Sequence, residues 1–139
     1  MTGDDLLEQW SRNSQHIASS IDRRLAGLLE IRTSQINGCA SSIDLHALAA
    51  RERGETEQRI YLLPAWRDAA CYSPRERAAL GWAEALTRLS EAHSYESAYA
   101  ALKLHFTEEE RLRLTLLIAD INGWNRIAAG FAEARAMAA

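Results

Sequence analysis

The sequence predicts an all-helical protein, and three observations support this fold class. Only two of its 139 residues are prolines and seven are glycines, so few positions interrupt a helix. Alanine, leucine, glutamate and arginine, which favour helices, are abundant. No segment shows the β-branched alternation that is typical of strands. We expect seven or eight helices in a compact bundle that forms a single domain over residues 1–139.

Apolar spacing and helix-ending residues predict the first three helices. Residues 4–19 and 22–35 each carry apolar side chains on one side. These are Leu6, Leu7, Trp10 and Ile17 for the first, and Leu25, Leu28, Leu29 and Ile36 for the second. Asn37 and Gly38 then end the second helix, because both tolerate the backbone conformations found at helix C-termini. A third helix is expected over residues 39–54.

Capping residues predict the remaining helices. Thr56 is a suitable N-cap for the fourth, which Pro64 is expected to kink or divide. In the segment SPRE from residue 73, a capping serine precedes a proline at the first helical position and a glutamate at the third, so a helix starts there. After a short helix over residues 95–104, Thr107 opens the last long apolar segment. Asn122-Gly123 is expected to interrupt that segment.

Composition and charge exclude several classes of partner. The net charge is −3, whereas nucleic-acid binding requires a clustered basic face. Arginines alternate with glutamates in stretches such as RERGETEQR, which is typical of solvated helix faces. No apolar run approaches the roughly 18 residues of a membrane span, and the acidic start MTGDDLLEQW does not resemble a signal peptide. We therefore expect a cytoplasmic protein that binds neither nucleic acid nor membrane.

The stretch NGCASSIDLH places three reactive side chains on one helix face. Because each residue of an α-helix rotates the chain by about 100°, Cys39, Ser42 and His46 fall within a sector of roughly 60°. Cys39 lies where the helix begins, and the backbone N–H groups and the positive dipole end there favour a thiolate. His46, two turns along, is placed to hold or accept a proton. These residues form a candidate thiol site.

Simpler explanations of these residues stay open. A cysteine in a helical protein often acts as a small buried apolar side chain, and a histidine can be purely structural. One cysteine and one histidine do not supply the four ligands of a zinc site, so we expect neither a metal nor another cofactor. No strand–turn–helix elbow surrounds the serines, which argues against a serine hydrolase. In a reducing compartment, Cys39 and Cys71 are expected to be thiols rather than disulfide partners.

The stretch IRTSQINGCASSIDLHALAARERGETEQRIYLLPAWRD resembles the alkylhydroperoxidase D-like branch of the carboxymuconolactone decarboxylase family. The segments SPRERAALGWAEALTRL and LTLLIADINGWNRIAAGF are similar to its later helices, so the resemblance covers about residues 22–131. It implies an all-helical fold that assembles as a homo-oligomer, commonly a trimer or a hexamer. Active members are thiol-dependent peroxidases. They use a Cys-x-x-Cys pair, a histidine four residues after the second cysteine and a glutamate about twelve residues before the first.

Two departures from the family pattern affect the chemistry. Cys39 matches the first cysteine and His46 the histidine, but Ser42 replaces the second cysteine and Gly27 the glutamate. Ser42 can form hydrogen bonds but cannot resolve a sulfenic acid. Glu30 lies one turn after Gly27 on nearly the same helix face, and it either reaches the site or is a surface charge. Ser42 is either a natural divergence or an introduced change, and the simultaneous Gly27 favours divergence.

Three functional hypotheses follow. In the first, Cys39 reduces a small-molecule hydroperoxide, His46, Ser42 and Glu30 assist, and an external thiol completes the cycle. In the second, a non-redox family member uses His46 and Glu30 as acid and base on a small carboxylated substrate. In the third, the chain is a catalytically impaired family member that serves binding or assembly. The sequence favours the first as the description of the family, with the third as its main alternative for this chain.

Overall fold

The computed structural model describes residues 1–91 and 95–131 and confirms the predicted all-α fold. These residues form seven α-helices and two short 3₁₀-helices, and no strand occurs among them. The α-helices are α1 (Gly3–Ser19), α2 (Arg23–Asn37), α3 (Ala40–Glu52), α4 (Glu57–Tyr61), α5 (Pro74–Thr87), α6 (Tyr95–Lys103) and α7 (Glu108–Gly130). The 3₁₀-helices are η1 (Leu63–Ala65) and η2 (Leu89–Glu91). None of the helices described has both the length and the apolar character needed to cross a bilayer.

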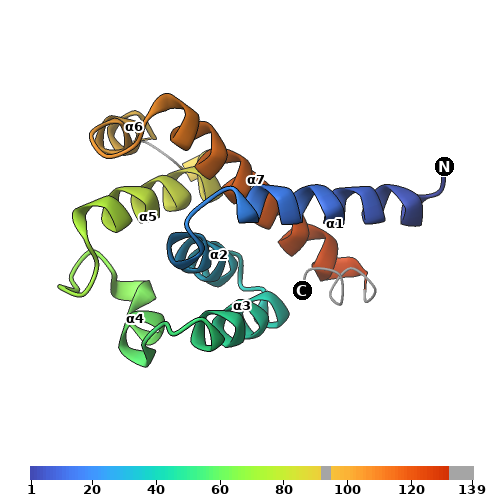
Figure 1. Cartoon of the computed structure of the whole chain (residues 1–139), viewed down its shortest axis with the longest axis horizontal. Coiled ribbons are helices and arrows are strands. Elements are labelled where there is room, and N and C mark those ends of the chain that lie inside the picture. Colours follow the sequence, from blue (N-terminus) through green and yellow to red (C-terminus); the bar gives the residue numbers. More distant parts are fainter. Residues whose placement is uncertain (92–94, 132–139) are drawn as a thin grey trace.

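Helix α2 lies at the centre of the bundle, and α3, α5 and α7 pack around it (Figure 1). All ten residues from Leu25 to Ser34 are buried, so this helix is enclosed on every side. The buried apolar side chains of α2 join those of α5 and α7 in one core, which includes Leu28, Leu80 and Leu117. Enclosure of a whole helix requires that its polar residues find partners within the protein.

An ion-pair cluster fixes α2 against α5. The Nη2 atom of Arg32 donates to Oε1 of Glu84 at 2.8 Å, and the indole of Trp66 donates to the same oxygen at 2.9 Å. Both Arg32 and Glu84 are buried. Because a buried charge without a partner is strongly unfavourable, this contact holds α2, and with it the polar residues on its other faces, in one position.

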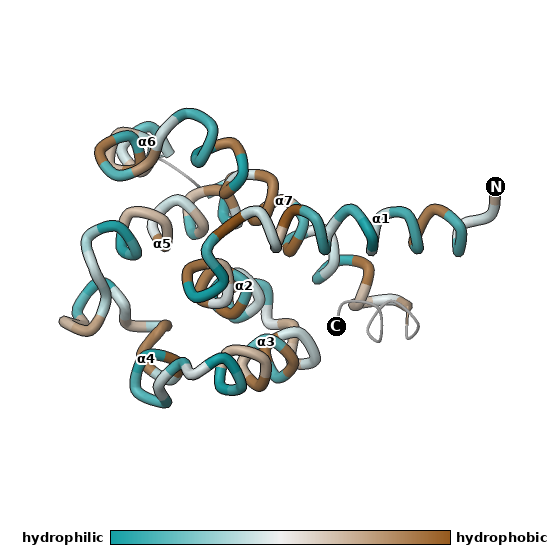
Figure 2. The backbone as a smooth tube through the Cα atoms, viewed as in Figure 1, coloured by the Kyte–Doolittle hydropathy of each residue, from teal (hydrophilic) through white to brown (hydrophobic). Residues whose placement is uncertain are grey.

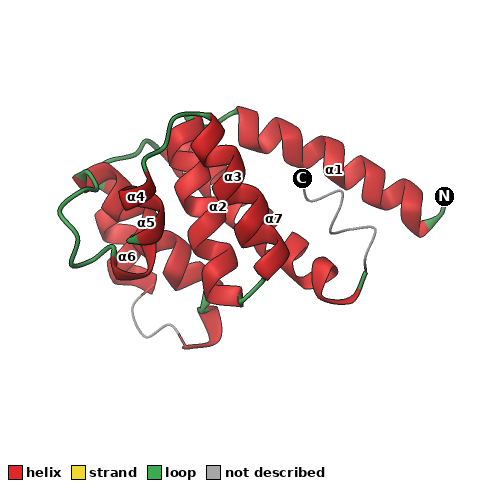
Figure 3. Ribbon diagram, turned by 90° about the horizontal axis from the view of Figure 1, so that it is seen from below, coloured by secondary structure: helices red, strands yellow, loops and turns green. Residues whose placement is uncertain are grey.

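Helix α1 packs at the edge of the bundle and crosses α7, and its N-terminal part extends beyond the other helices (Figures 1 and 3). None of its residues is fully buried, and its surface is largely hydrophilic with isolated hydrophobic positions (Figure 2). The rings of Trp10 and Trp124 stack with centroids 4.7 Å apart, and the Trp10 indole donates to Oδ1 of Asp120 at 2.6 Å. These contacts join α1 to α7 along one wall of the candidate site.

The predicted helix starts at Thr56, Ser73 and Thr107 are confirmed. Each side chain accepts a hydrogen bond from the backbone N–H three residues later. At Ser73 and Thr107 the third residue of the helix is a glutamate that accepts from the cap's own N–H, which completes a capping box. The expected break after Asn37 is also confirmed, because Gly38 adopts the left-handed conformation, with φ 66°.

The predicted interruption at Asn122-Gly123 is wrong, since α7 continues through both residues to Gly130. The Asn122 amide donates to the carbonyl of Ile118 one turn earlier, so this side chain bonds within the helix. Gly123 is required by packing: a Cβ atom there would lie 2.6 Å from Cζ2 of Trp10, closer than any side chain tolerates. The glycine therefore allows α1 to approach α7 and does not end the helix.

Two further boundaries differ in detail. The third helix covers Ala40–Glu52, so Cys39 is its N-cap residue and lies just outside the helix. Pro64 does not kink α4, which ends at Tyr61, but instead lies in η1. A proline lacks the N–H that a continuing helix requires, so the chain turns before it.

Candidate functional site

The candidate site lies between α2 and α3, which are joined directly at Gly38 and Cys39. Helix α2 begins with Asp22 as its N-cap, whose carboxylate accepts from the Leu25 N–H at 3.1 Å. The left-handed Gly38 reverses the chain so that α3 packs back against α2 (Figure 3). This return places the middle of α2, at Glu30, beside the middle of α3, at His46.

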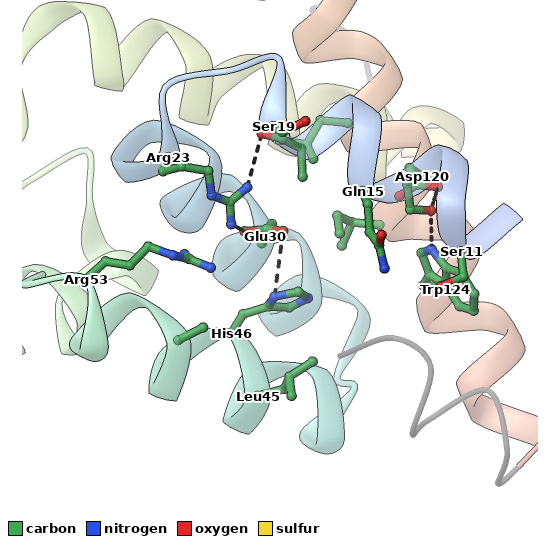
Figure 4. Close-up of a pocket in the computed structure, with 15 residues that line it drawn as sticks. Ser11, Gln15, Ser19, Arg23, Glu30, Leu45, His46, Arg53, Asp120 and Trp124 are labelled. Carbon is green, nitrogen blue, oxygen red and sulfur yellow. Dashed lines mark hydrogen bonds and ion pairs between the residues drawn. The ribbon is translucent and has the colours of Figure 1, made fainter. Parts of the chain in front are cut away.

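Glu30 and His46 face each other at the centre of the site (Figure 4). The His46 Nδ1 atom is 3.8 Å from Oε2 of Glu30, and the two side chains are 12% and 8% exposed. The other carboxylate oxygen of Glu30 is 3.5 Å from Nη2 of Arg23, whose Nη1 donates to the Ala18 carbonyl at 3.1 Å. Glu30 is therefore a buried site residue and not a surface charge.

Burial shifts the pKa values of this pair in opposite directions. Removal from water, together with the positive charges of Arg23 and Arg53, lowers the pKa of His46 to about 4. Burial also raises the pKa of Glu30, although both arginines oppose this, and the negative charge of Asp120 adds to it. Near neutral pH His46 is thus an uncharged imidazole, which can accept a proton, beside a carboxyl group that retains its proton more readily than usual.

Cys39 and Ser42 lie at the start of α3. The Cys39 Sγ atom is 3.2 Å from Oγ of Ser42 and 3.7 Å from Oγ of Ser41. Ser42 is 2% exposed, whereas Cys39 is half-buried. A buried hydroxyl at this distance can accept from the thiol, and it can donate to the sulfur when the thiol is ionised.

A pocket of about 330 Å³ opens next to the Glu30–His46 pair. Side chains from α1, α2, α3 and α7 line it, together with Arg23 and Arg53. Among the described residues that line it are Leu45, His46 and Ala49 of α3, but not Cys39. The pocket therefore belongs to the carboxyl–imidazole pair, and the sulfur lies at the end of the same helix.

The wall opposite the arginines is a polar network between α1 and α7. The Asp120 carboxylate accepts from Trp10 and from the Ser14 hydroxyl at 2.8 Å, while the Trp124 indole donates to Ser14 at 2.8 Å. Burial raises the pKa of Asp120, and the hydrogen bonds from Ser14 and the two tryptophans oppose that rise. This network was not identified in the sequence, because its members come from two helices more than 100 residues apart.

The four residues that the sequence singled out thus form two groups in the structure: Glu30 lies beside His46, and Cys39 lies beside Ser42. Arg23 and Arg53 were missed, since the arginines were attributed to solvated faces. A signal was present, because each lies seven residues, or two turns, from a site residue and so on its face. Among the described residues, no group of three or more His, Cys, Asp or Glu side chains is arranged to hold a metal ion.

The fold and this site define a class of all-helical proteins. Its features here are the buried central helix α2 and the stretch from Cys39 to His46 at the start of α3. Residues 4–85 match the carboxymuconolactone decarboxylase family. The chain belongs to the carboxymuconolactone decarboxylase family.

Two relatives support the assignment. The uncharacterized protein YdfG of Bacillus subtilis (strain 168) is 47% identical over 109 residues, which are 78% of this chain and 74% of YdfG. The crystal structure of ATU0492 from Agrobacterium tumefaciens superposes with a TM-score of 0.84 at 38% identity, over 92% of this chain and 86% of that one. ATU0492 is a protein of unknown function that is provisionally described as the antioxidant defence protein AhpD.

Proposed function

We propose that this protein is a thiol-dependent hydroperoxide reductase in which Cys39 is the reacting residue. The observation that carries the proposal is the position of the sulfur, at the N-terminus of α3 and 3.2 Å from the buried Ser42 hydroxyl. The N–H groups and the dipole of the helix favour a thiolate there, and a hydrogen bond from Ser42 adds to this. The likeness to ATU0492, with its suggested antioxidant role, also supports it.

The reaction requires one cysteine of the protein and two external thiols. The Cys39 thiolate attacks the terminal oxygen of the hydroperoxide, the S–O bond forms as the O–O bond breaks, and the alkoxide leaves as an alcohol after it takes a proton. One external thiol then displaces water from the sulfenic acid and forms a mixed disulfide. A second thiol attacks that disulfide, releases the external disulfide and restores Cys39. Ser42 cannot replace the external thiol, because it has no sulfur.

Glu30 and His46 supply the proton in this proposal. The raised pKa of Glu30 favours its protonated form, and the neutral imidazole of His46 can accept a proton and pass it toward the sulfur end of α3. At 3.8 Å the two side chains are too far apart for a direct hydrogen bond, so transfer requires a bridging water or a small rotation.

Mass spectrometry after brief exposure to cumene hydroperoxide tests the proposal. We expect Cys39 to gain one oxygen atom, or a dimedone adduct when dimedone is present, and peroxide consumption with a dithiol to disappear in Cys39→Ala. Cys71→Ser is the matched control, because Cys71 lies in the segment before α5, where its carbonyl accepts from Arg59, and should leave activity intact. Oxidation of Cys71 with an unmodified Cys39 would contradict the proposal, because Cys71 would then be the reacting residue.

A second candidate function is favoured by the pocket itself, whose lining includes Glu30 and His46 but not Cys39 among the described residues. In that function the pair acts as acid and base on a small carboxylated substrate without redox chemistry. Turnover that survives Cys39→Ala but is lost in His46→Ala would select it over the peroxidase.

We further propose that the chain acts in the cytoplasm as a homo-oligomer. Large apolar side chains are exposed on several helices, among them Leu6 at 55% and Leu112 at 55% exposure. Such surface is commonly covered by a second copy of a chain.

A further inference from the structure

Two guanidinium groups converge at one end of the pocket. Arg23 lies in the first turn of α2 and Arg53 follows the last turn of α3. Figure 4 shows both side chains on one side of the Glu30–His46 pair, with Asp120 and Trp124 on the other side. The same two arginines also line a neighbouring hollow of about 290 Å³, so they stand between the pocket and a second opening.

The charges at this end do not balance. Glu30 lies 3.5 Å from Arg23, and the Arg23 side chain also bonds to the Ala18 carbonyl. The Arg53 guanidinium, in contrast, forms no hydrogen bond or ion pair with another described residue. Asp120 is engaged by Trp10 and Ser14 at the opposite wall. One positive charge is therefore left over at the arginine end when Glu30 is ionised, and two when it is protonated, so this end suits an anionic ligand.

Gly27 keeps the flank of Arg53 open. This glycine lies inside α2, where glycine is less favourable than alanine. A Cβ atom at this position would be 3.9 Å from Nη1 of Arg53 and 3.8 Å from Cβ of Ala50. A methyl group thus fits in ordinary contact, whereas any longer side chain would extend into the hollow between the arginines.

The walls formed by α3 and α7 are largely apolar, whereas α1 contributes polar side chains such as Ser11 and Gln15. Leu45, Ala49, Leu117, Ile121 and the ring of Trp124 line the pocket beyond the charged residues. Its volume of about 330 Å³ lies at the small end of the range of roughly 300–1,000 Å³ for ligand sites. A planar guanidinium fork matches a carboxylate, and an apolar wall matches a compact hydrocarbon body.

We propose that Arg23 and Arg53 form a carboxylate-binding subsite, and that the protein binds a small organic acid with an apolar body. The carboxylate lies between the two guanidinium groups beside Gly27, and the body extends along Glu30 and His46 toward Trp124. If the protein is the proposed hydroperoxide reductase, its substrate is a hydroperoxide of such an acid, and this assignment of the substrate rests on the proposed function. Binding of the acid itself does not depend on that function.

Isothermal titration with benzoate, and with benzamide as its neutral counterpart, tests the subsite. We expect benzoate to bind at least tenfold more tightly than benzamide, and Arg53→Gln to remove that preference, because it deletes one charge-assisted hydrogen bond. Gly27→Glu should abolish benzoate binding by placing a carboxylate between the arginines. Arg113→Gln is the matched control, because this arginine lines neither hollow and pairs with Glu109, and it should bind benzoate as the wild type does.

The outcomes separate the two proposals. Equal binding of benzoate and benzamide by the folded wild type would overturn the subsite, whatever the activity. An unchanged affinity of Arg53→Gln for benzoate would also overturn it. If Gly27→Glu does not fold, the result for Arg53→Gln decides the test. Preferential benzoate binding without peroxide turnover would leave the subsite standing and remove the reductase function. For an active enzyme, the ratio of kcat/KM for para-carboxylated cumene hydroperoxide to that for cumene hydroperoxide should fall about tenfold in Arg53→Gln.

Discussion

Acidification from pH 7 to pH 4 should destabilise the folded protein through His46. The imidazole is 12% exposed, and burial together with Arg23 and Arg53 lowers its pKa from 6.5 to about 4. In the unfolded chain the same imidazole takes up a proton near its ordinary pKa. The unfolded state therefore binds more protons between these two values, so the stability that neutral His46 contributes is complete above about pH 6.5 and falls as the pH drops toward 4.

The size of this effect follows from the lowered pKa of His46. A drop from 6.5 to about 4, at about 1.4 kcal/mol for each pH unit, corresponds to about 3 kcal/mol of unfolding free energy. Single domains are stable by about 5–15 kcal/mol, so a loss of this size is large enough to measure.

Urea unfolding between pH 7 and pH 4, followed by circular dichroism, measures the loss. The wild type should lose about 3 kcal/mol more than His46→Gln, which cannot take up the proton. Both proteins retain Glu30. Because the pKa of Glu30 is raised, its contribution to stability decreases as the pH rises, which is opposite to the effect of His46, and the comparison of the two proteins cancels it.

Parallel loss of stability in the wild type and in His46→Gln would refute this reasoning. Such a result would mean that His46 is protonated in the folded protein at the same pH as in the unfolded chain. The imidazole would then be hydrated or paired with an ionised Glu30, and the proposed proton transfer from Glu30 would lose its support.

Three further predictions concern Cys39, the contact of α1 with α7, and assembly. Ser42→Cys should form a disulfide with Cys39 on mild oxidation, which mass spectrometry before and after reduction detects; two persisting thiols would contradict the 3.2 Å approach. Gly123→Ala should lose about 1–3 kcal/mol in urea unfolding, because its methyl group meets Trp10, whereas Gly130→Ala on the same helix should lose less. Light scattering should give a multiple of 15.5 kDa, and a stable monomer at micromolar concentration would disprove the oligomer.

The sequence by itself determined the helical class and most helix ends. The capping boxes at Ser73 and Thr107 and the left-handed Gly38 were predicted correctly, because a cap depends on residues within three or four positions of it. The grouping of Cys39 with Ser42 was predicted for the same reason, since Cys39 is the N-cap of α3 and Ser42 follows it by three residues.

The tertiary structure alone decided which side chains from different helices meet. Only the packing of α3 against α2 brings Glu30 within 3.8 Å of His46, and only the position of both helices turns Arg23 and Arg53 toward the same pocket. Gly123 is a second example, because its local sequence predicts a helix end, whereas in the structure the glycine leaves space for the Trp10 ring of α1. Local preferences decide where helices begin and end, but burial and close contact between distant segments decide what each polar residue faces.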